Sequence, residues 1–170
     1  MTWFSILKGL EFKGGIVLTV PAVDLQHRFM FRAMKRATID HSQTMFKEFH
    51  ITLFSPQEVK SFKEVHGLSN KGAKLKIREL LESFTVPHPS LVLGILQYAE
   101  RGEKTTFFFP LKSQSEWQIF SNKIADKLEI PHVERFFHIS VSNNQGGNPY
   151  QSIGNITEDD VSGWLLDDLV

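Results

Sequence analysis

The sequence predicts an α+β fold built from two similar small halves. Short apolar, β-branched runs that are typical of strands alternate with longer segments whose apolar residues recur at helical spacing. A strand–helix–strand order also occurs twice with matched spacing, because His50 lies 29 residues after Pro21 and His138 lies 28 residues after Pro110. The repeat indicates two related halves of one fold rather than two independent domains.

The first half contains two predicted strands and two predicted helices. Residues 15–21 are a β-branched run closed by proline, and residues 48–54 form a second apolar run. Residues 22–37 between them carry apolar residues close to helical spacing, and we interpret their basic face as solvated. A second helix is expected over residues 71–84, before a pair of prolines.

The second half is expected to begin with a hairpin and to end with a strand. Residues 91–98 and 105–111 are strand-like runs that flank a charged turn with Gly102 at its tip. The last predicted strand covers residues 135–142. Residues 143–149 follow it and are rich in Asn and Gly, and we interpret them as a turn rather than as a phosphate-binding loop.

A helix is predicted between these strands, over residues 113–128. Ser113, at the start of this range, is a candidate N-cap, and Glu116 follows three residues later. This spacing is the signature of a capping box, in which the serine and the glutamate each bond the other's backbone N–H.

Pro87 and Pro89 mark the boundary between the two halves. Lobe one then covers about residues 1–86 and lobe two about residues 87–170. Lobes of about 85 residues bury thin cores when they stand alone. We therefore expect residues 1–170 to form a single domain in which the lobes support each other.

Composition argues against several classes of protein. Nineteen Lys and Arg balance nineteen Asp and Glu, and this zero formal charge is a poor basis for binding long duplex nucleic acid. The absence of cysteine excludes disulfides, thiolate zinc sites and cysteine nucleophiles. No apolar run reaches the roughly 18 residues that span a bilayer, and charges interrupt residues 1–13. We expect a cytoplasmic monomer that binds no membrane.

Both halves carry the same four-residue pattern. It reads His-Ile-Thr-Leu from His50 and His-Ile-Ser-Val from His138. Because side chains alternate along a strand, His50 and Thr52 share one face of their strand. His138 and Ser140 share a face in the same way, and the apolar neighbours of each pair point to a core. Two matches among seven histidines have a chance probability of about one per cent at this composition.

Two imidazoles and two hydroxyls that face one cleft suit chemistry at phosphorus. Histidine titrates nearest neutrality, so His50 and His138 can act as one general acid and one general base. Thr52 and Ser140 can donate hydrogen bonds to the non-bridging oxygens of a phosphate. A ribose 2′-hydroxyl nucleophile would form a 2′,3′-cyclic phosphate, whereas water would open a cyclic phosphate or another diester.

These motifs resemble those of the two-histidine (2H) phosphoesterases. That family includes RNA-processing cyclic phosphodiesterases, 2′-5′ RNA ligase-like proteins, 2′-5′ oligoadenylate phosphodiesterases and phage anti-CBASS nucleases. The resemblance depends on the two motifs and on the strands upstream of them, and it covers most of residues 15–141. It implies a bilobal α+β fold with two pseudo-symmetric antiparallel sheets flanking a central cleft and helices outside.

The resemblance also implies an activity. The implied enzyme is a metal-independent phosphodiesterase that uses no cofactor and acts on 2′,3′-cyclic phosphates, 2′-5′ linkages or cyclic oligonucleotides. His50 and His138 would be the pair that supplies the catalytic acid and base. Thr52 and Ser140 would supply the hydroxyls that bind the phosphate. Many members place an arginine shortly after the second motif, where this chain has Ser-Asn-Asn at residues 142–144. We expect a small nucleotide or oligonucleotide as the substrate.

Other features carry less specific predictions. Tyr150 is a candidate to stack on a base, with packing over a lobe an equal alternative. The five histidines outside the motifs form no His-Glu-x-x-His site, so no metal site is predicted. A basic cluster is interpreted as a solvated face; it consists of Lys71, Lys74, Lys76 and Arg78.

A different class of function stays open beside the enzyme. The same cleft could belong to a nucleotide- or RNA-binding module that turns nothing over. The presence of both histidines, His50 and His138, together with both hydroxyls favours the enzyme, because binding alone does not require acid–base geometry.

Overall fold

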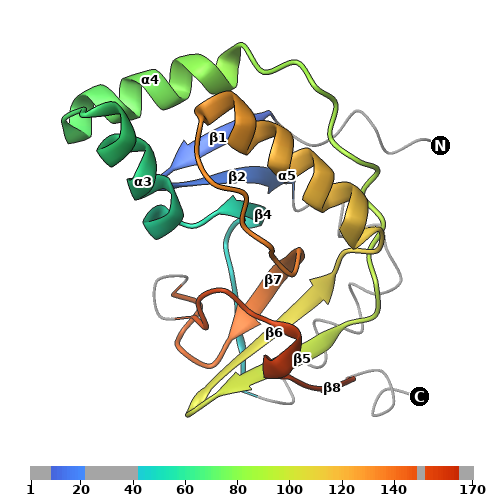
Figure 1. The fold of residues 1–170 in the computed structure, drawn as a ribbon. Helices are drawn as coiled ribbons and strands as arrows, with labels where there is room; N and C mark the ends of the chain where they lie inside the picture. The colour runs from blue at the N-terminus through green and yellow to red at the C-terminus, as the bar shows by residue number, and fades with distance from the viewer. Residues whose placement is uncertain (1–8, 22–41, 149–151, 165–170) are drawn as a thin grey trace.

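The computed structural model describes residues 9–21, 42–148 and 152–164, and over these residues the fold is mixed α+β (Figure 1). The predicted α+β class is therefore confirmed. The helix predicted over residues 22–37 lies outside the described residues, and so does Tyr150.

The described elements follow one another along the chain in a fixed order. The strands are β1 (Leu10–Lys13), β2 (Gly15–Val20), β3 (Thr44–Met45), β4 (Phe49–Phe54), β5 (Gln97–Arg101), β6 (Lys104–Pro110), β7 (His138–Asn143) and β8 (Val161–Trp164). The α-helices are α3 (Pro56–His66), α4 (Asn70–Glu82) and α5 (Gln114–Leu128), and a 3₁₀ turn, η3, covers Glu158–Asp160.

The strands form one antiparallel sheet in the order β1-β2-β4-β7-β6-β5-β8, with β3 paired to β7. In each half, the strand that carries a motif lies beside the strand predicted upstream of it, because β4 pairs with β2 and β7 pairs with β6. The halves meet where Ile51 of β4 pairs with Ile139 of β7. The prediction of two sheets flanking a cleft is not confirmed, because the hydrogen-bonded order runs through this junction.

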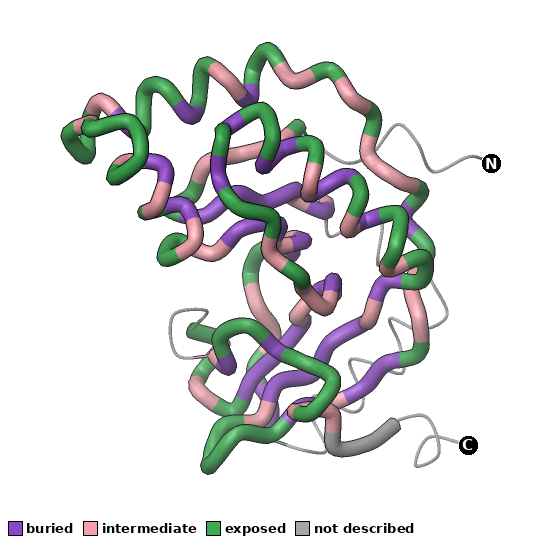
Figure 2. The backbone as a smooth tube through the Cα atoms, viewed as in Figure 1, coloured by how far each residue is buried: buried purple, intermediate pink, exposed green. Residues whose placement is uncertain are grey.

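The main core lies between one face of the sheet and the three helices. Alternate residues of β2, β4, β6 and β7 point into it, among them Ile51, Phe107 and Ile139. The helices contribute residues such as Phe62, Ile77 and Trp117. Figure 1 shows the helices grouped together, and Figure 2 shows buried positions concentrated along the central strands.

Serine caps begin the two helices of the first half. Ser55 and Glu58 form a capping box at α3, a helix that the sequence analysis missed, and the Ser69 hydroxyl accepts from the N–H of Gly72 at α4. At α5 the predicted capping box is wrong. Ser113 has a left-handed backbone (φ 59°), and its side chain makes no capping hydrogen bond. The helix itself is present and begins at Gln114, one residue after the predicted start.

The predicted hairpin of the second half is present, with β5 and β6 joined at Gly102 (φ 63°). Its first strand, however, covers Gln97–Arg101 and not residues 91–98. Pro110 explains the difference, because it has no N–H with which to continue the ladder. Its carbonyl instead accepts a 2.6 Å hydrogen bond from Gly94, where a Cβ would lie 2.8 Å from the Pro110 ring.

A smaller apolar cluster lies on the opposite face of the second half. Phe108 and Ala99 point away from the helices and pack against Ile153 and Ile156 of the segment after β7. An ion pair between Arg101 and Asp160 (2.6 Å) holds this segment on β5.

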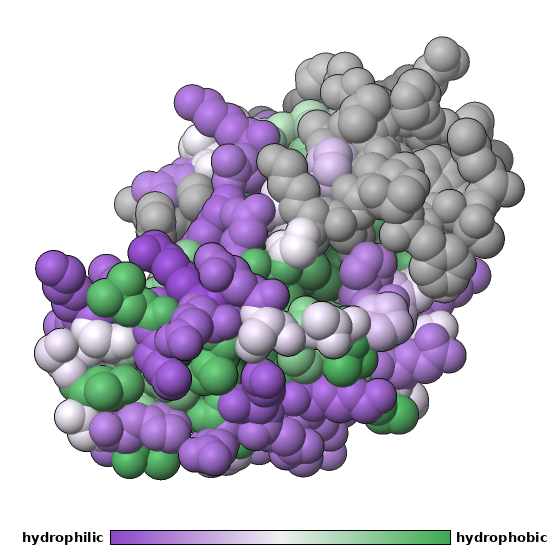
Figure 3. Space-filling view, turned by 90° about the horizontal axis from the view of Figure 1, so that it is seen from above, coloured by the Kyte–Doolittle hydropathy of each residue, from purple (hydrophilic) through white to green (hydrophobic). Residues whose placement is uncertain are grey.

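Among the described residues, no helix has the length and apolar character needed to cross a membrane. Seen from above, the described surface is mainly hydrophilic, and its apolar side chains lie in separate places (Figure 3). Among the apolar side chains of the described residues, Leu75 and Ile119 are more than half exposed.

The junction between the halves yields a stability prediction. Ile139→Ala removes a side chain with 0% exposure at the β4–β7 contact, and we expect it to lower the free energy of unfolding by about 2–5 kcal/mol. Ile119→Ala, on the exposed side of α5, is the matched control and should change it by no more than about 0.5 kcal/mol. Urea denaturation followed by circular dichroism measures both, and equal effects would contradict the junction's importance.

Candidate functional site

Both motifs lie on the face of the sheet opposite the helices. In β4, Ile51 points into the main core, so His50 and Thr52 point to the other side. In β7, Ile139 points into the same core, and His138 and Ser140 point away from it. All four side chains are partly exposed.

The junction brings the two motifs next to each other. Directly opposed residues in an antiparallel pair point to the same face, and Ile51 opposes Ile139. On either side of this pair, His50 therefore neighbours Ser140, and Thr52 neighbours His138. The two imidazoles are diagonal neighbours, a relation in which residues lie about 7–8 Å apart.

His138 is held from several sides. Its Nδ1 lies 2.8 Å from the carbonyl oxygen of Phe136. Its ring packs against Phe108 (5.5 Å between centroids, nearly perpendicular) and against Phe136 (6.0 Å, stacked). A carbonyl oxygen can only accept, so Nδ1 carries the hydrogen. In the neutral ring, Nε2 therefore keeps its lone pair, as a general base requires.

Burial among these rings lowers the pKa of His138 from 6.5 to about 4, although the bond to Phe136 opposes the shift. The charges of Arg135 and His50 contribute to this lowering of the pKa, after burial. The ring is therefore neutral at pH 7.

His50 has a different environment. Burial lowers its pKa as well, and the charge of Lys13 adds to this effect while that of Glu48 opposes it. Lys13 and Glu48 form an ion pair of 2.9 Å, so a cation and an anion act together near this ring. Among the described residues, no hydrogen bond holds the imidazole of His50.

Residues 142–144, where many 2H members carry an arginine, have structural contacts here. Ser142 donates to Gln43, and the Asn143 side chain accepts from the N–H groups of Gln145 and Gly147. These bonds support the interpretation of residues 143–149 as a turn, as far as the segment is described.

Arg135 is the cation whose charge acts on His138. Its side chain is only 6% exposed, forms an ion pair with Glu58 of α3 and donates to Asn155. It therefore links the approach to β7 with the helix that follows β4. Its Nη atoms are engaged by protein groups, so it differs from a free phosphate-binding arginine.

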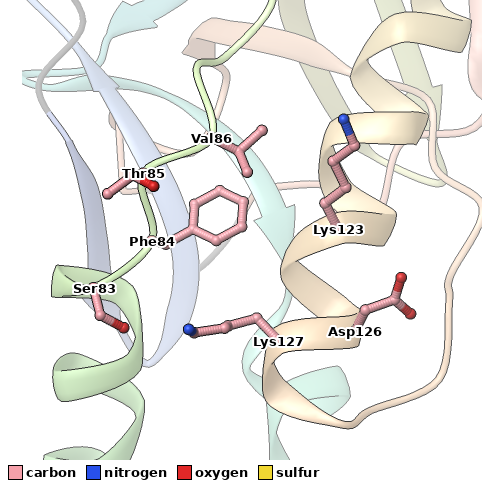
Figure 4. Close-up of a pocket in the computed structure, with 7 residues that line it drawn as sticks. All are labelled: Ser83, Phe84, Thr85, Val86, Lys123, Asp126 and Lys127. Carbon is pink, nitrogen blue, oxygen red and sulfur yellow. The ribbon is translucent and has the colours of Figure 1, made fainter.

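Two surface cavities are found in the described part of the structure. One, of about 430 Å³, is shown in Figure 4, where Lys123 and Lys127 of α5 face Phe84 and Val86. The other, of about 560 Å³, is lined in part by Arg135 and Phe136. None of the four motif residues lines either cavity, although Phe136, which lines the second, packs against the ring of His138.

Other candidates from the sequence can be placed only in part. Tyr150 lies outside the described residues. In the basic cluster, Lys76 pairs with Glu79 and Arg78 lies over the ring of Phe12, consistent with a surface face. Within the described residues, no group of three or more His, Asp or Glu side chains is arranged to hold a metal ion.

Sequence reasoning missed three residues around the histidines, namely Lys13, Thr19 and Phe136. The alternation of side chains along the predicted strand could have identified Thr19, because it lies two residues before the proline that closes this strand. Lys13 precedes that strand, and its position near His50 depends on a pairing of β1 with β2 that no local pattern marked.

The environment of His138 predicts a specific titration. Because its folded pKa of about 4 lies below the unfolded value of 6.5, its contribution to stability is present above pH 6.5 and is lost as the pH falls to about 4. In that window the slope from this residue approaches about 1.4 kcal/mol per pH unit, and His138→Gln should remove it. An NMR titration of the imidazole measures the midpoint directly, and a midpoint near 6.5 would contradict the described environment.

No family model matches the chain, and neither a curated protein nor a solved structure matches it.

Proposed function

We propose that this protein is a metal-independent phosphodiesterase that acts on a small nucleotide or oligonucleotide. The observation that carries the proposal is the direct pairing of the two motif strands at Ile51 and Ile139. This pairing gives one face two imidazoles and two hydroxyls in a pseudo-symmetric arrangement. The resemblance to the 2H phosphoesterases supports the same activity, with the two halves of the sheet as the two lobes.

The two histidines would divide the proton transfers. His138 would act as the base, because Nδ1 is engaged by Phe136 and the neutral ring offers the lone pair of Nε2. His50 would then act as the acid and protonate the leaving oxygen. An anionic phosphate bound beside His50 favours its charged form and opposes the lowering of its pKa by burial.

The hydroxyls would hold the phosphate between the rings. Thr52 neighbours His138 and Ser140 neighbours His50, so one hydroxyl lies on each side. Each can donate to a non-bridging oxygen, where charge develops in an in-line displacement. The substrate class comprises 2′,3′-cyclic phosphates, 2′-5′ linkages and cyclic oligonucleotides.

The proposal is tested with a panel of labelled substrates incubated with the protein in EDTA. The panel contains 2′,3′-cyclic nucleotides, 2′-5′ oligoadenylates and cyclic di- and trinucleotides. Turnover of any of them supports the proposal and names the subclass. Binding without turnover would instead indicate the non-catalytic nucleotide-binding module.

Removal of either motif histidine should abolish this turnover. His50→Ala and His138→Ala should each lower kcat by about 10²–10⁴-fold, and the double variant should be scarcely worse because the pair acts as a unit. His132→Ala is the matched control, since this exposed histidine pairs with Asp126 away from the motifs. Circular dichroism checks the fold, and loss of activity caused by unfolding would make the histidines structural instead.

The pH profile should be acidic and independent of added metal. Catalysis needs neutral His138 and protonated His50, so kcat/KM of the free enzyme should be bell-shaped, with its optimum between about pH 4 and pH 6.5. The limbs belong to the coupled pair. A bound phosphate raises both pKa values, so the kcat profile should lie at higher pH. Activity lost in EDTA and restored by a divalent cation would rule out this mechanism.

A further inference from the structure

Thr19 places a buried hydroxyl without a partner next to the proposed acid. It lies on β2 directly opposite His50 of β4, and opposed residues of an antiparallel pair share a face. Its Oγ1 is buried and makes no hydrogen bond. A buried hydroxyl that makes no hydrogen bond lowers the stability of a protein, so the presence of this one calls for an explanation in the site around it.

The two motif histidines differ in how their rings are held. The ring of His138 donates from Nδ1 to the carbonyl of Phe136, whereas no hydrogen bond holds the ring of His50 within the described chain. Opposed side chains have Cβ atoms about 4.5–5.5 Å apart. At that separation, rotation about the Thr19 Cα–Cβ bond brings Oγ1 within reach of Nδ1, the ring nitrogen nearer the backbone.

We propose that Thr19 is the positioning residue of His50: in the protonated ring, Nδ1–H donates to the Thr19 hydroxyl oxygen, and this bond turns Nε2–H toward the leaving oxygen. After Nε2 gives its proton to the leaving oxygen, the neutral ring keeps its hydrogen on Nδ1, so the same contact persists through the proton transfer. The inference rests on the proposed function and deepens it: each histidine would have its own Nδ1 partner, a carbonyl for the base and a hydroxyl for the acid.

The contact is tested by ¹⁵N NMR of the imidazoles above pH 7, which requires no activity. In Thr19→Val, the Nδ1 shift of His50 should move toward that of a free imidazole nitrogen while the shifts of His138 stay unchanged, and Thr19→Ser should retain the wild-type shift. Thr106→Val is the matched control, because Thr106 also has a buried, unpartnered hydroxyl but lies opposite Asn143. All three variants keep the titratable groups that face His50, namely Lys13, Glu48 and His138.

The catalytic consequence is tested by kinetics on the substrate that the panel identifies. Thr19→Val should lower kcat about 3- to 10-fold, the worth of one hydrogen bond, with KM changed less than twofold, and Thr19→Ser should restore the rate. If Thr19→Val does not fold, Thr19→Ala removes the same hydroxyl. An unchanged His50 shift or an unchanged kcat would overturn the inference. Failure of the proposed function would be recognised separately, as absence of turnover by the wild-type protein.

Discussion

The pairing of Ile51 with Ile139 is the contact on which the rest of the structure depends. It joins the β1-β2-β4 part of the sheet to the β7-β6-β5-β8 part, and both side chains are fully buried under the helices. Because strand side chains alternate, burying these two isoleucines places His50, Thr52 and their counterparts on the opposite face. An apolar contact in the core thus sets the position of the polar residues.

The motifs are alike in sequence, but their surroundings differ. The ring of His138 packs against Phe108 and Phe136, and the carbonyl of Phe136 fixes its tautomer. His50 instead borders a strand that presents Thr19, and it is subject to the opposed charges of Lys13 and Glu48. Different environments around two titratable groups are how proteins divide acid and base roles between them.

Secondary contacts stabilise the position of β7. The Arg135–Glu58 ion pair ties the approach to β7 to α3, and the C-terminal segment is held on β5 by Arg101 and Asp160. Arg101 is about half exposed, whereas Arg135 and Glu58 are largely buried. Loss of a single partner from a buried ion pair is more costly than loss from an exposed one. Arg135 therefore contributes more to the geometry around His138 than Arg101 does.

Local patterns in the sequence determined the α+β class, the strands around Val20 and Phe109, the helix that begins at Gln114 and the faces shared by the four motif residues. These features depend on near neighbours, through alternation, helical spacing and turn chemistry. Three outcomes were decided only by the tertiary structure: one continuous sheet, the left-handed backbone of Ser113 and a first hairpin strand shortened at Pro110. The environments of the two histidines were also decided only by the tertiary structure. The continuous sheet and the surroundings of the histidines depend on residues far apart in the chain, and pairing and burial across such distances leave no periodic signal in the sequence.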